Sequence, residues 1–262
     1  MLLALMLPPI VIDDVDDPRL APYRALKDHR LRAESGRFVA ESERVVRRLV
    51  ASGLTVESVL ITAPRLATLA DALGGPFPVY LASQPVLDGI AGFHVHRGCL
   101  AIGLRPPAAR IPPGARALVV LEDLTDVDNL GAIARNAAAF GADALVLSPR
   151  CADPFYRKAV RVSVGAVLDL PVVRLARWPD DLATLRADGL TLIAAVLEPD
   201  ATPLASLPRP GRFALLLGAE GPGLSAAARA LCDARVTIPM APGADSLNVA
   251  TAGAVFLHAL LG

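Results

Sequence analysis

The 262-residue sequence has few cysteines and no net charge. Its three cysteines, Cys99, Cys151 and Cys232, are odd in number and far apart, which excludes a disulfide framework and a C-x-x-C redox pair. This use of cysteine indicates a reducing compartment, and we expect the cytoplasm. A net charge of zero gives no overall attraction to a nucleic acid or to a membrane.

Long apolar runs are absent as well. No stretch reaches the roughly 18 apolar residues that a membrane-spanning helix needs, so we expect no membrane partner. The nearest candidate, residues 247–262, contains Thr251 and His258 and is predicted to be a buried helix. The start, MLLALMLPP, lacks a basic segment and a small-residue cleavage site, which favours a disordered or edge-packed leader over a signal peptide.

Apolar residues are plentiful, and the charges are unevenly spread. Hydrophobic residues make up 53% of the chain and the mean hydropathy is +0.48, which is ample for a core. Residues 19–50 hold nine Lys and Arg against four acids, and residues 150–177 hold six against two. Such segments suit a polyanion-binding face, although solvated helix faces would have the same composition.

A proline-rich stretch divides the chain. The prolines of residues 106–115 disfavour a helix and mark a linker between an N-terminal domain, residues 1–105, and a C-terminal domain, residues 116–262. In the first domain the pattern predicts a small α/β sandwich, with helices near Ser42–Ser52 and Arg65–Leu73 and strands at Val56–Ile61 and Cys99–Leu104.

The second domain alternates strands and helices. Strands are predicted at ALVVLE, ALVLS, VVRLA, LTLIAAVL, RFALLLG and RVTIPM. Helices are predicted at residues 129–140, closed by Gly141, at Phe155–Leu168, 180–189 and Ser225–Cys232, and at the chain end. Because these strands are apolar throughout, they are expected to form a parallel sheet covered by helices on both faces, an α/β fold.

The stretch LLLGAEGPGLS, residues 215–225, is a strand followed by a glycine-rich turn. A phosphate-binding loop would place Lys and then Ser or Thr after its last glycine, but Leu224 stands there. A dinucleotide fingerprint would open the first strand-turn-helix unit, and this turn comes near the end of the chain. The turn therefore belongs to neither of these two ligand classes.

Two further segments carry polar side chains at strand-to-helix turns. In EDLTDVDNLGAIAR, residues 122–135, Asp126 or Asp128 is expected to cap the helix, and Arg135 lies roughly 140° around it from Leu130 and points away from the buried stripe. In VTIPMAPGADSLNVATAG, residues 236–253, Ser246 is expected to cap the last helix with Asn248 in its first turn.

The segment FHVHRGC, residues 93–99, has residue types that can bind a metal. His94 and His96 would share a face of a strand near Cys99, but no third or fourth ligand is evident in the sequence, so we expect no metal. The chain also has no G-x-S-x-G nucleophile elbow and no cysteine in a reactive setting.

Taken together, the three segments resemble the SpoU/TrmH family of the SPOUT superfamily, the SAM-dependent RNA 2′-O-ribose methyltransferases. The first motif corresponds to DLTDVDNLGAIAR with its N-x-G-x-x-x-R core, the second to LLLGAEGPGLS with CDARVTIPM, and the third to SLNVATAGA; SVGAVLDLP between them is also similar. Three positions depart from the family's usual residues: Val127 replaces proline, Ser42 replaces glycine, and Ala250 replaces a serine.

The resemblance implies a C-terminal trefoil knot in which Gly218, Glu220 and Gly223 of the turn, with Ile238, Met240 and Leu247, hold SAM in a bent form. It implies a polar set of Asn129, Arg135, Glu220, Ser246 and Asn248 around the reaction. Arg135, held by Asn129 and aided by an RNA phosphate, would position and activate the ribose hydroxyl without a metal. FVAESERVVRRLVASG and HRGCLAIG are similar to a ribosomal-protein-like RNA-binding domain.

The resemblance also implies a homodimer in which each active site includes residues of the partner subunit. The apolar last helix, with Val249, Ala252, Val255, Phe256 and Leu260, suits such an interface, and it equally suits an intrachain core. We expect methylation of ribosomal RNA. The alternatives are a tRNA 2′-O-methyltransferase and a non-catalytic RNA-binding protein that retains the knot; a nucleotide-dependent oxidoreductase is disfavoured by the missing dinucleotide fingerprint.

Overall fold

The computed structural model describes residues 7–24 and 35–262. The chain divides into two compact units. Unit 1 comprises Met1–Pro107 and Phe155–Leu168, and unit 2 comprises Ala108–Pro154 and Asp169–Gly262. Residues 1–6 of the leader lie outside the described residues, as do Lys27, Arg30 and Arg32 of the first basic segment.

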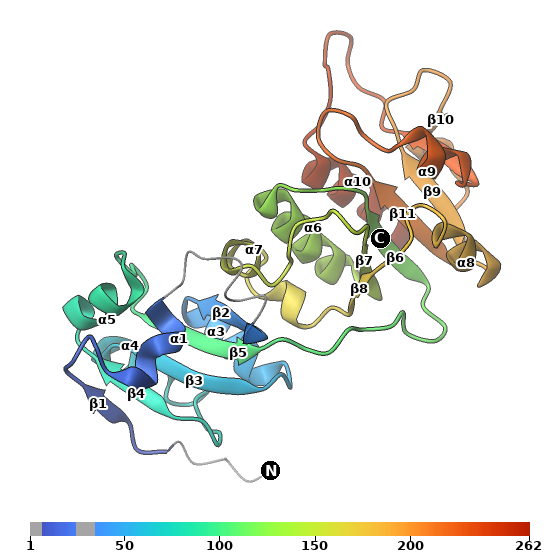
Figure 1. Cartoon of the computed structure of the whole chain (residues 1–262). Helices are drawn as coiled ribbons and strands as arrows, with labels where there is room; N and C mark the ends of the chain where they lie inside the picture. The colour runs from blue at the N-terminus through green and yellow to red at the C-terminus, as the bar shows by residue number, and fades with distance from the viewer. Residues whose placement is uncertain (1–6, 25–34) are drawn as a thin grey trace. The chain divides into compact units, whose positions relative to one another are not determined.

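Unit 1 is built on a five-stranded sheet in the order β1-β4-β3-β5-β2 (Figure 1). β1, β4 and β3 are parallel, whereas β5 runs antiparallel to both β3 and β2. The strands are β1 (Ile10–Ile12), β2 (Arg37–Glu41), β3 (Val56–Ile61), β4 (Val79–Ala82) and β5 (Cys99–Leu104). The helices are α1 (Ala21–Arg24), α3 (Glu43–Ala51), α4 (Ala63–Leu69), α5 (Gln84–Ala91) and α7 (Arg157–Val162), with short 3-10 turns η1 (Pro18–Leu20) and η2 (Ala166–Leu168).

The sequence predicted β3, β5 and α3 of this unit at their observed bounds, within a residue. It missed β1, β2, β4 and α5, and α4 begins and ends earlier than predicted. β1 is only three residues long and β4 only four, which is too short for a periodic pattern to stand out. Val39, Leu60, Leu100 and Ile102, which lie on neighbouring strands, form the core with Tyr23.

Unit 2 contains a seven-stranded sheet in the order β10-β12-β9-β11-β6-β7-β8, and every pairing in it is parallel, as the sequence predicted. The strands are β6 (Ala117–Leu121), β7 (Ala144–Leu147), β8 (Val172–Arg174), β9 (Thr191–Ala195), β10 (Thr202–Pro203), β11 (Phe213–Leu217) and β12 (Ala234–Thr237). All residues of β6, β7 and β11 are buried, because helices and loops cover both faces of the sheet.

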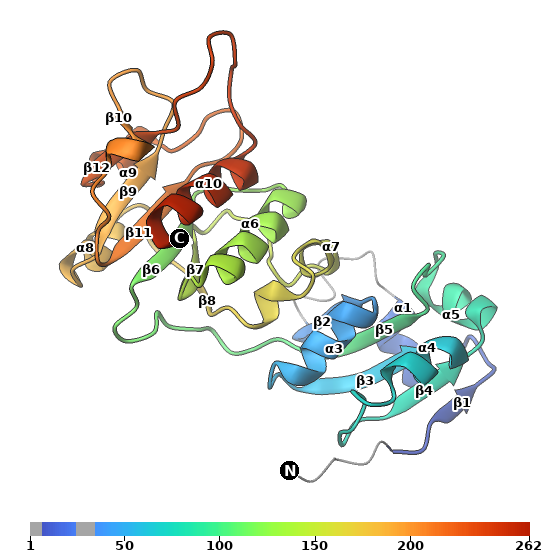
Figure 2. The same cartoon turned by 180° about the vertical axis from the view of Figure 1, so that it is seen from behind.

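The helices of unit 2 are α6 (Val127–Phe140), α8 (Leu182–Ala187), α9 (Ala226–Ala230) and α10 (Val249–Leu261), with the 3-10 turn η3 (Leu204–Ser206). α6 and α10 lie side by side on one face of the sheet (Figure 2). Gly141 ends α6 with a φ of 78°, the left-handed conformation expected for a helix-closing glycine. The end of the chain is thus packed against the first helix of unit 2.

The predicted helix over Phe155–Leu168 is wrong in its length. α7 ends at Val162, and η2 begins only at Ala166. Val164 and Gly165 between them have φ values of 52° and 76°, a left-handed conformation that cannot continue a right-handed helix. A Cβ at Gly165 would lie 3.1 Å from the Cδ of Arg48 in α3, so this turn packs closely within unit 1.

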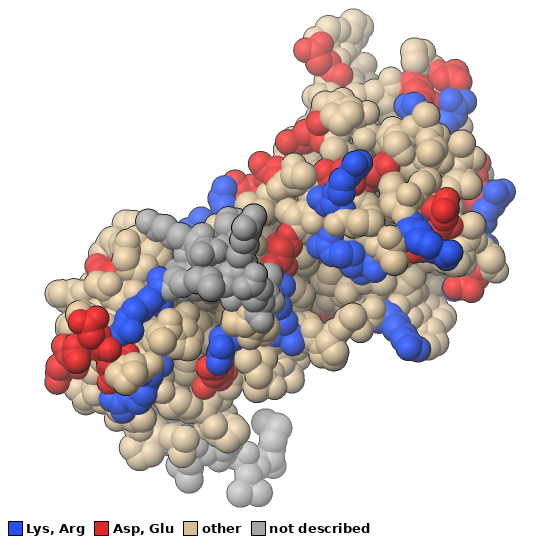
Figure 3. Space-filling view, in the orientation of Figure 1, with Lys and Arg blue, Asp and Glu red and all other residues tan. Residues whose placement is uncertain are grey.

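Ion pairs neutralise much of the basic character of the two Arg-rich segments. Both signs of charge appear on the face shown in Figure 3. The pairs include Arg37–Glu57, Arg47–Asp71, Arg150–Asp123, Arg157–Glu41 and Arg177–Asp181. Arg44, on α3, is exposed and makes no hydrogen bond or ion pair with the residues that the structure describes. Of the helices in the described ranges, none has the length and apolar character to cross a membrane.

Candidate functional site

The turn that follows β11 requires glycine at several positions. A Cβ at Gly218 would lie 2.2 Å from the backbone carbon of Gly223, closer than two atoms can approach. The N–H of Gly223 donates to the carbonyl of Ala219 at 2.9 Å, and Gly221 and Gly223 have φ values of 83° and 66°. The chain therefore folds back on itself directly after the strand, as only glycines permit.

A buried acid holds the far end of this turn. Glu122, just after β6, is 3% exposed and accepts a hydrogen bond from the backbone N–H of Ser225 at 2.8 Å. Its other oxygen accepts from the indole N–H of Trp178 at 2.5 Å. Ser225 itself caps α9 by accepting from the N–H of Ala228. One carboxylate thus connects β6, the segment after β8 and the end of the turn.

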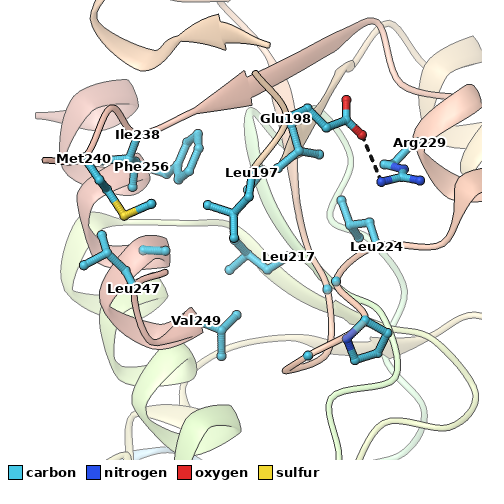
Figure 4. A pocket seen from close by; sticks show the side chains of 17 residues that line it. Leu197, Glu198, Leu217, Leu224, Arg229, Ile238, Met240, Leu247, Val249 and Phe256 are labelled. Atoms are coloured by element: carbon cyan, nitrogen blue, oxygen red, sulfur yellow. Dashed lines mark ion pairs between the residues drawn. The ribbon is translucent and has the colours of Figure 1, made fainter. Parts of the chain in front are cut away.

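A pocket of about 260 Å³ opens between this turn, the loop after β9 and the segment that leads into α10 (Figure 4). Five of the six residues predicted from the sequence to bind a cofactor line it: Gly218, Gly223, Ile238, Met240 and Leu247. Glu220, the sixth, is exposed and does not line the pocket, because its side chain is directed to a neighbouring polar cluster. The wall consists mostly of aliphatic side chains and glycine backbone.

Several lining residues were not foreseen from the sequence. They are residues 195–198 at the end of β9 and after it, Leu217, Leu224, Arg229, and Val249, Ala252 and Phe256 on α10, whereas Gly221 and Pro222 belong to the predicted turn. β9 is hydrogen-bonded to β11, so the loops that follow the two strands meet at the same edge of the parallel sheet. The spacing of Val249, Ala252 and Phe256 places them on one face of a helix, and this could be read from the sequence. The surface that this face contacts could not.

Three polar side chains from distant parts of the sequence meet beside the turn. The side-chain amide of Asn129 donates to Oε1 of Glu220, and the amide of Asn248 donates to Oδ1 of Asn129 at 2.9 Å. Asn129 lies in the first turn of α6, where Asp126 caps the helix by accepting from the N–H groups of Asp128 and Asn129. Asn129, Glu220 and Asn248 were all predicted site residues.

The predicted cap of α10 is wrong. Asn248, not Ser246, is the N-cap: its Oδ1 accepts from the N–H of Ala250 at 2.9 Å and from that of Thr251 at 3.2 Å. Asn is as effective as Ser in this role, and the helix begins two residues later than expected. Ser246 is exposed and precedes the cap. Asn248 therefore fixes the start of α10 with its oxygen and the polar cluster with its nitrogen.

Arg135 is not brought to the cluster. It is six residues beyond Asn129 on α6, which places the two side chains on different faces of the helix and about 9 Å apart along it. Arg135 is exposed and makes no hydrogen bond or ion pair with any described residue. The expected contact by which Asn129 would hold Arg135 is thus not formed, since the amide of Asn129 is committed to Glu220 and its oxygen to Asn248.

Ala250, in the first turn of α10, lies at the contact with α6. It is 6% exposed, and its carbonyl accepts from the side-chain amide of Asn136 at 2.9 Å. It is not among the residues that line the pocket. The departure from the serine usual in the family therefore falls at a helix–helix contact.

The surroundings of the described histidines and cysteines indicate neither a metal site nor a reactive thiol. His94 Nδ1 lies 2.6 Å from a carboxylate oxygen of Asp88, and its ring packs edge-on against that of His96. Within residues 7–24 and 35–262 no group of three or more His, Cys, Asp or Glu side chains could hold a metal ion. Burial raises the pKa of the Cys99 and Cys232 thiols to about 12, so both stay protonated and unreactive.

Comparison with known proteins places these features in one family. The model of the SpoU rRNA Methylase family matches residues 116–258. An uncharacterized tRNA/rRNA methyltransferase of Mycobacterium bovis is 46% identical over 256 residues, 94% of this chain and 89% of the relative. The 23S rRNA (guanosine(2553)-2′-O)-methyltransferase RlmP of Bacillus subtilis is 27% identical and covers 96% of this chain and 99% of its own.

The fold is also similar to that of solved methyltransferases. The crystal structure of an AdoMet-bound rRNA methyltransferase from Sinorhizobium meliloti superimposes with a TM-score of 0.83 and 25% sequence identity, and the match covers 96% of this chain and 97% of that one. The parallel-sheet α/β fold predicted from the sequence is confirmed by this similarity.

Proposed function

Because this chain belongs to the SpoU rRNA methylase family and is a SAM-dependent RNA methyltransferase, we propose that it methylates a ribose 2′-hydroxyl of ribosomal RNA. The observation that carries the proposal is the pocket at the Gly218–Gly223 turn, with the cluster of Asn129, Glu220 and Asn248 beside it. All of these residues lie within the segment that the family model matches.

The residues of the pocket fit SAM. Backbone groups of the turn can approach a ligand closely, because Gly218, Gly221 and Gly223 carry no side chain. Ile238, Met240 and Leu247 offer an apolar surface to a flat ring such as adenine. SAM supplies an electrophilic methyl group on a positively charged sulfur. We propose that these two surfaces hold it.

The polar cluster is proposed to position the ribose. A 2′-hydroxyl is a weak nucleophile: as its oxygen bonds to the methyl carbon, the methyl–sulfur bond breaks, S-adenosylhomocysteine leaves, and the hydroxyl proton passes to water. Asn129, Glu220 and Asn248 form a connected set of donors and acceptors that can orient it. Alignment of the hydroxyl with the methyl–sulfur bond would supply much of the acceleration. Ser246, on the segment before α10, remains a proposed member of the site.

Arg135 is proposed to act in a homodimer. An arginine is a poor base, so its role would be to bind an RNA phosphate and stabilise the developing charge. Its side chain points outward from α6 and has no partner among the described residues, which leaves it available to the site of a second copy. On α10, Val255 is 39% exposed and can contribute to such an interface. Phe256 and Leu260, which the sequence also suggested, are instead buried within unit 2.

Three further assignments complete the proposal. The C-terminal part of unit 2 is proposed to form a trefoil knot, and the packing of α10 against α6 and the convergence of the three pocket segments support it. The N-terminal domain, residues 1–105, is proposed to bind RNA, and the SPOUT domain, residues 116–262, to carry out the transfer. The unpaired cysteines are consistent with a cytoplasmic location.

Methyl transfer from labelled SAM tests the function. Ribosomal RNA and tRNA, both stripped of native methylation, are offered separately, and the label is located after digestion to nucleosides. Label in the ribose of rRNA is the expected result. Ribose label in tRNA instead would change the substrate class, and binding of SAM and RNA without any transfer would favour a non-catalytic RNA-binding protein.

A further inference from the structure

One charged pair interrupts the apolar wall of the pocket. Glu198, in the loop after β9, and Arg229, on α9, are the charged residues among those that line it. Their side chains form an ion pair, with Nη1 of Arg229 2.9 Å from Oε1 of Glu198. In Figure 4 this pair lies on the side of the pocket opposite Ile238 and Met240. A ligand that fills the pocket therefore meets an apolar surface at one end and two charges at the other.

Glu198 also forms an ion pair with a second arginine. Nη1 of Arg235, on β12, lies 2.6 Å from Oε2 of Glu198, and Nη2 of the same side chain lies 2.8 Å from Oδ2 of Asp200. Both oxygens of Glu198 are thus engaged by arginines. The carboxylate is fixed in place and in turn fixes the guanidinium of Arg229.

Arg229 retains capacity to bind a further anion. A guanidinium has five N–H donors, and Glu198 is the acidic side chain within ion-pair distance of Arg229 among the described residues. The side chains of Arg229 and Glu198 are 36% and 22% exposed, so each is partly shielded from water and still accessible from the pocket. A planar guanidinium in this setting suits a carboxylate, which it can bind through two parallel hydrogen bonds.

SAM has a carboxylate at one end only. Its adenine is flat and uncharged, whereas its methionine moiety carries a carboxylate and an ammonium group. We propose that Arg229 binds the carboxylate of the methionine moiety of SAM, and that Glu198 is a positioning residue that orients Arg229. This inference rests on the proposed function, because it takes the pocket to be the SAM site. It makes Arg229 the residue by which the protein discriminates SAM from nucleosides that lack the amino-acid tail.

The test compares two ligands that differ by that tail. S-adenosylhomocysteine has the carboxylate, and 5′-methylthioadenosine has the same nucleoside and a thioether but no amino acid. Dissociation constants for both are measured by calorimetry with the full-length chain and with Arg229→Gln. We expect Arg229→Gln to raise the dissociation constant of S-adenosylhomocysteine by roughly tenfold to a hundredfold, the range for the loss of a hydrogen bond to a charged group. The dissociation constant of 5′-methylthioadenosine should stay within about twofold of its original value.

Two further variants control the measurement. Arg186→Gln removes another arginine that is paired with an acid, Asp233, but lies outside the pocket, and it should change neither affinity. Arg229→Lys keeps the positive charge but lacks the planar guanidinium that can donate two parallel hydrogen bonds. It should therefore recover part of the affinity for S-adenosylhomocysteine that Arg229→Gln loses. Thermal melting of each variant shows whether it is folded.

The outcomes separate this inference from the function on which it rests. Equal loss of affinity for both ligands would place Arg229 at the nucleoside, and unchanged affinity for both would remove it from the cofactor site; either result overturns the inference. Loss of RNA binding with unchanged affinity for S-adenosylhomocysteine would assign Arg229 to a phosphate and also overturn it. If the unmodified protein methylates RNA in these cases, the proposed function stands. If it binds neither ligand and transfers no methyl, the proposed function itself fails.

Discussion

The side-chain amide of Asn248 donates a hydrogen bond to the side-chain oxygen of Asn129 at 2.9 Å, across 119 residues of sequence. The bond joins the first turn of α6 to the N-cap of α10, the first and last helices of unit 2. Through Asn129 it continues to Glu220, on the glycine-rich turn. The three family motifs are thus linked by two hydrogen bonds between side chains.

The variant Asn248→Asp separates the two roles of Asn248, which are to cap α10 and to donate a hydrogen bond to Asn129. An aspartate keeps the oxygen that caps α10, so the stability of the helix should be preserved, but it removes the N–H that donates to Asn129. We expect methyl transfer to fall by roughly tenfold or more, the equivalent of one lost hydrogen bond, with a melting temperature close to that of the unmodified protein. Asn248→Ala is the comparison: it should lose both activity and about 1 kcal/mol of stability. Full activity of Asn248→Asp would show that the link to Asn129 is dispensable.

Arg135→Ala should abolish transfer while SAM still binds. Because Arg135 is exposed and makes no hydrogen bond or ion pair with described residues, its removal should leave the fold and the pocket unchanged. We expect a fall in kcat of roughly a hundredfold or more, typical of the loss of a charge that stabilises a transition state, and a dissociation constant for SAM within about twofold. Arg110→Ala, at another exposed arginine without a described partner, is the matched control. An active Arg135→Ala enzyme would remove Arg135 from the mechanism.

Gly218→Ala should destroy the pocket. The added methyl group would lie 2.2 Å from the backbone carbon of Gly223 and 2.3 Å from the backbone nitrogen of Leu224, and backbone atoms cannot move aside as a flexible side chain can. We expect SAM binding to be lost in calorimetry. Gly211→Ala is the control, since a Cβ there meets no atom within 4 Å and the φ value is not left-handed. Normal SAM affinity in Gly218→Ala would mean that the turn is not part of the cofactor site.

Ser42→Gly should stabilise unit 1. Ser42, between β2 and α3, has φ and ψ of 93° and 153°, a region that is nearly restricted to glycine and costs other residues about 1–3 kcal/mol. Glycine loses more backbone entropy on folding, so we expect a net gain of about 1 kcal/mol in the free energy of unfolding. Ser52→Gly, at a residue with an ordinary φ of −74°, should give no gain. Urea unfolding of both variants measures the difference, and equal stabilities would show that Ser42 is not strained.

Much of unit 2 follows from local sequence alone. Strands such as β6, β7 and β11 are apolar at every position, and a strand that cannot show one face to water must be covered on both, which determines a parallel sheet between helices. Asp126 and Gly141 determine where α6 begins and ends, because capping depends on a few neighbouring residues. The glycines at residues 218–223 likewise predicted the turn that lines the pocket.

The tertiary structure decided which distant residues meet. The ion pair of Glu198 with Arg229 depends on the adjacency of β9, β11 and β12 in the sheet, and strand order is not encoded in the pattern of any single strand. The choice of Asn248 over Ser246 as a cap depends on where α10 can pack against α6, since both residues satisfy the local rule. Local chemistry thus determined most strands and helices of unit 2, the glycine-rich turn and most of the polar residues of the site. Packing between segments far apart in the chain decided their partners.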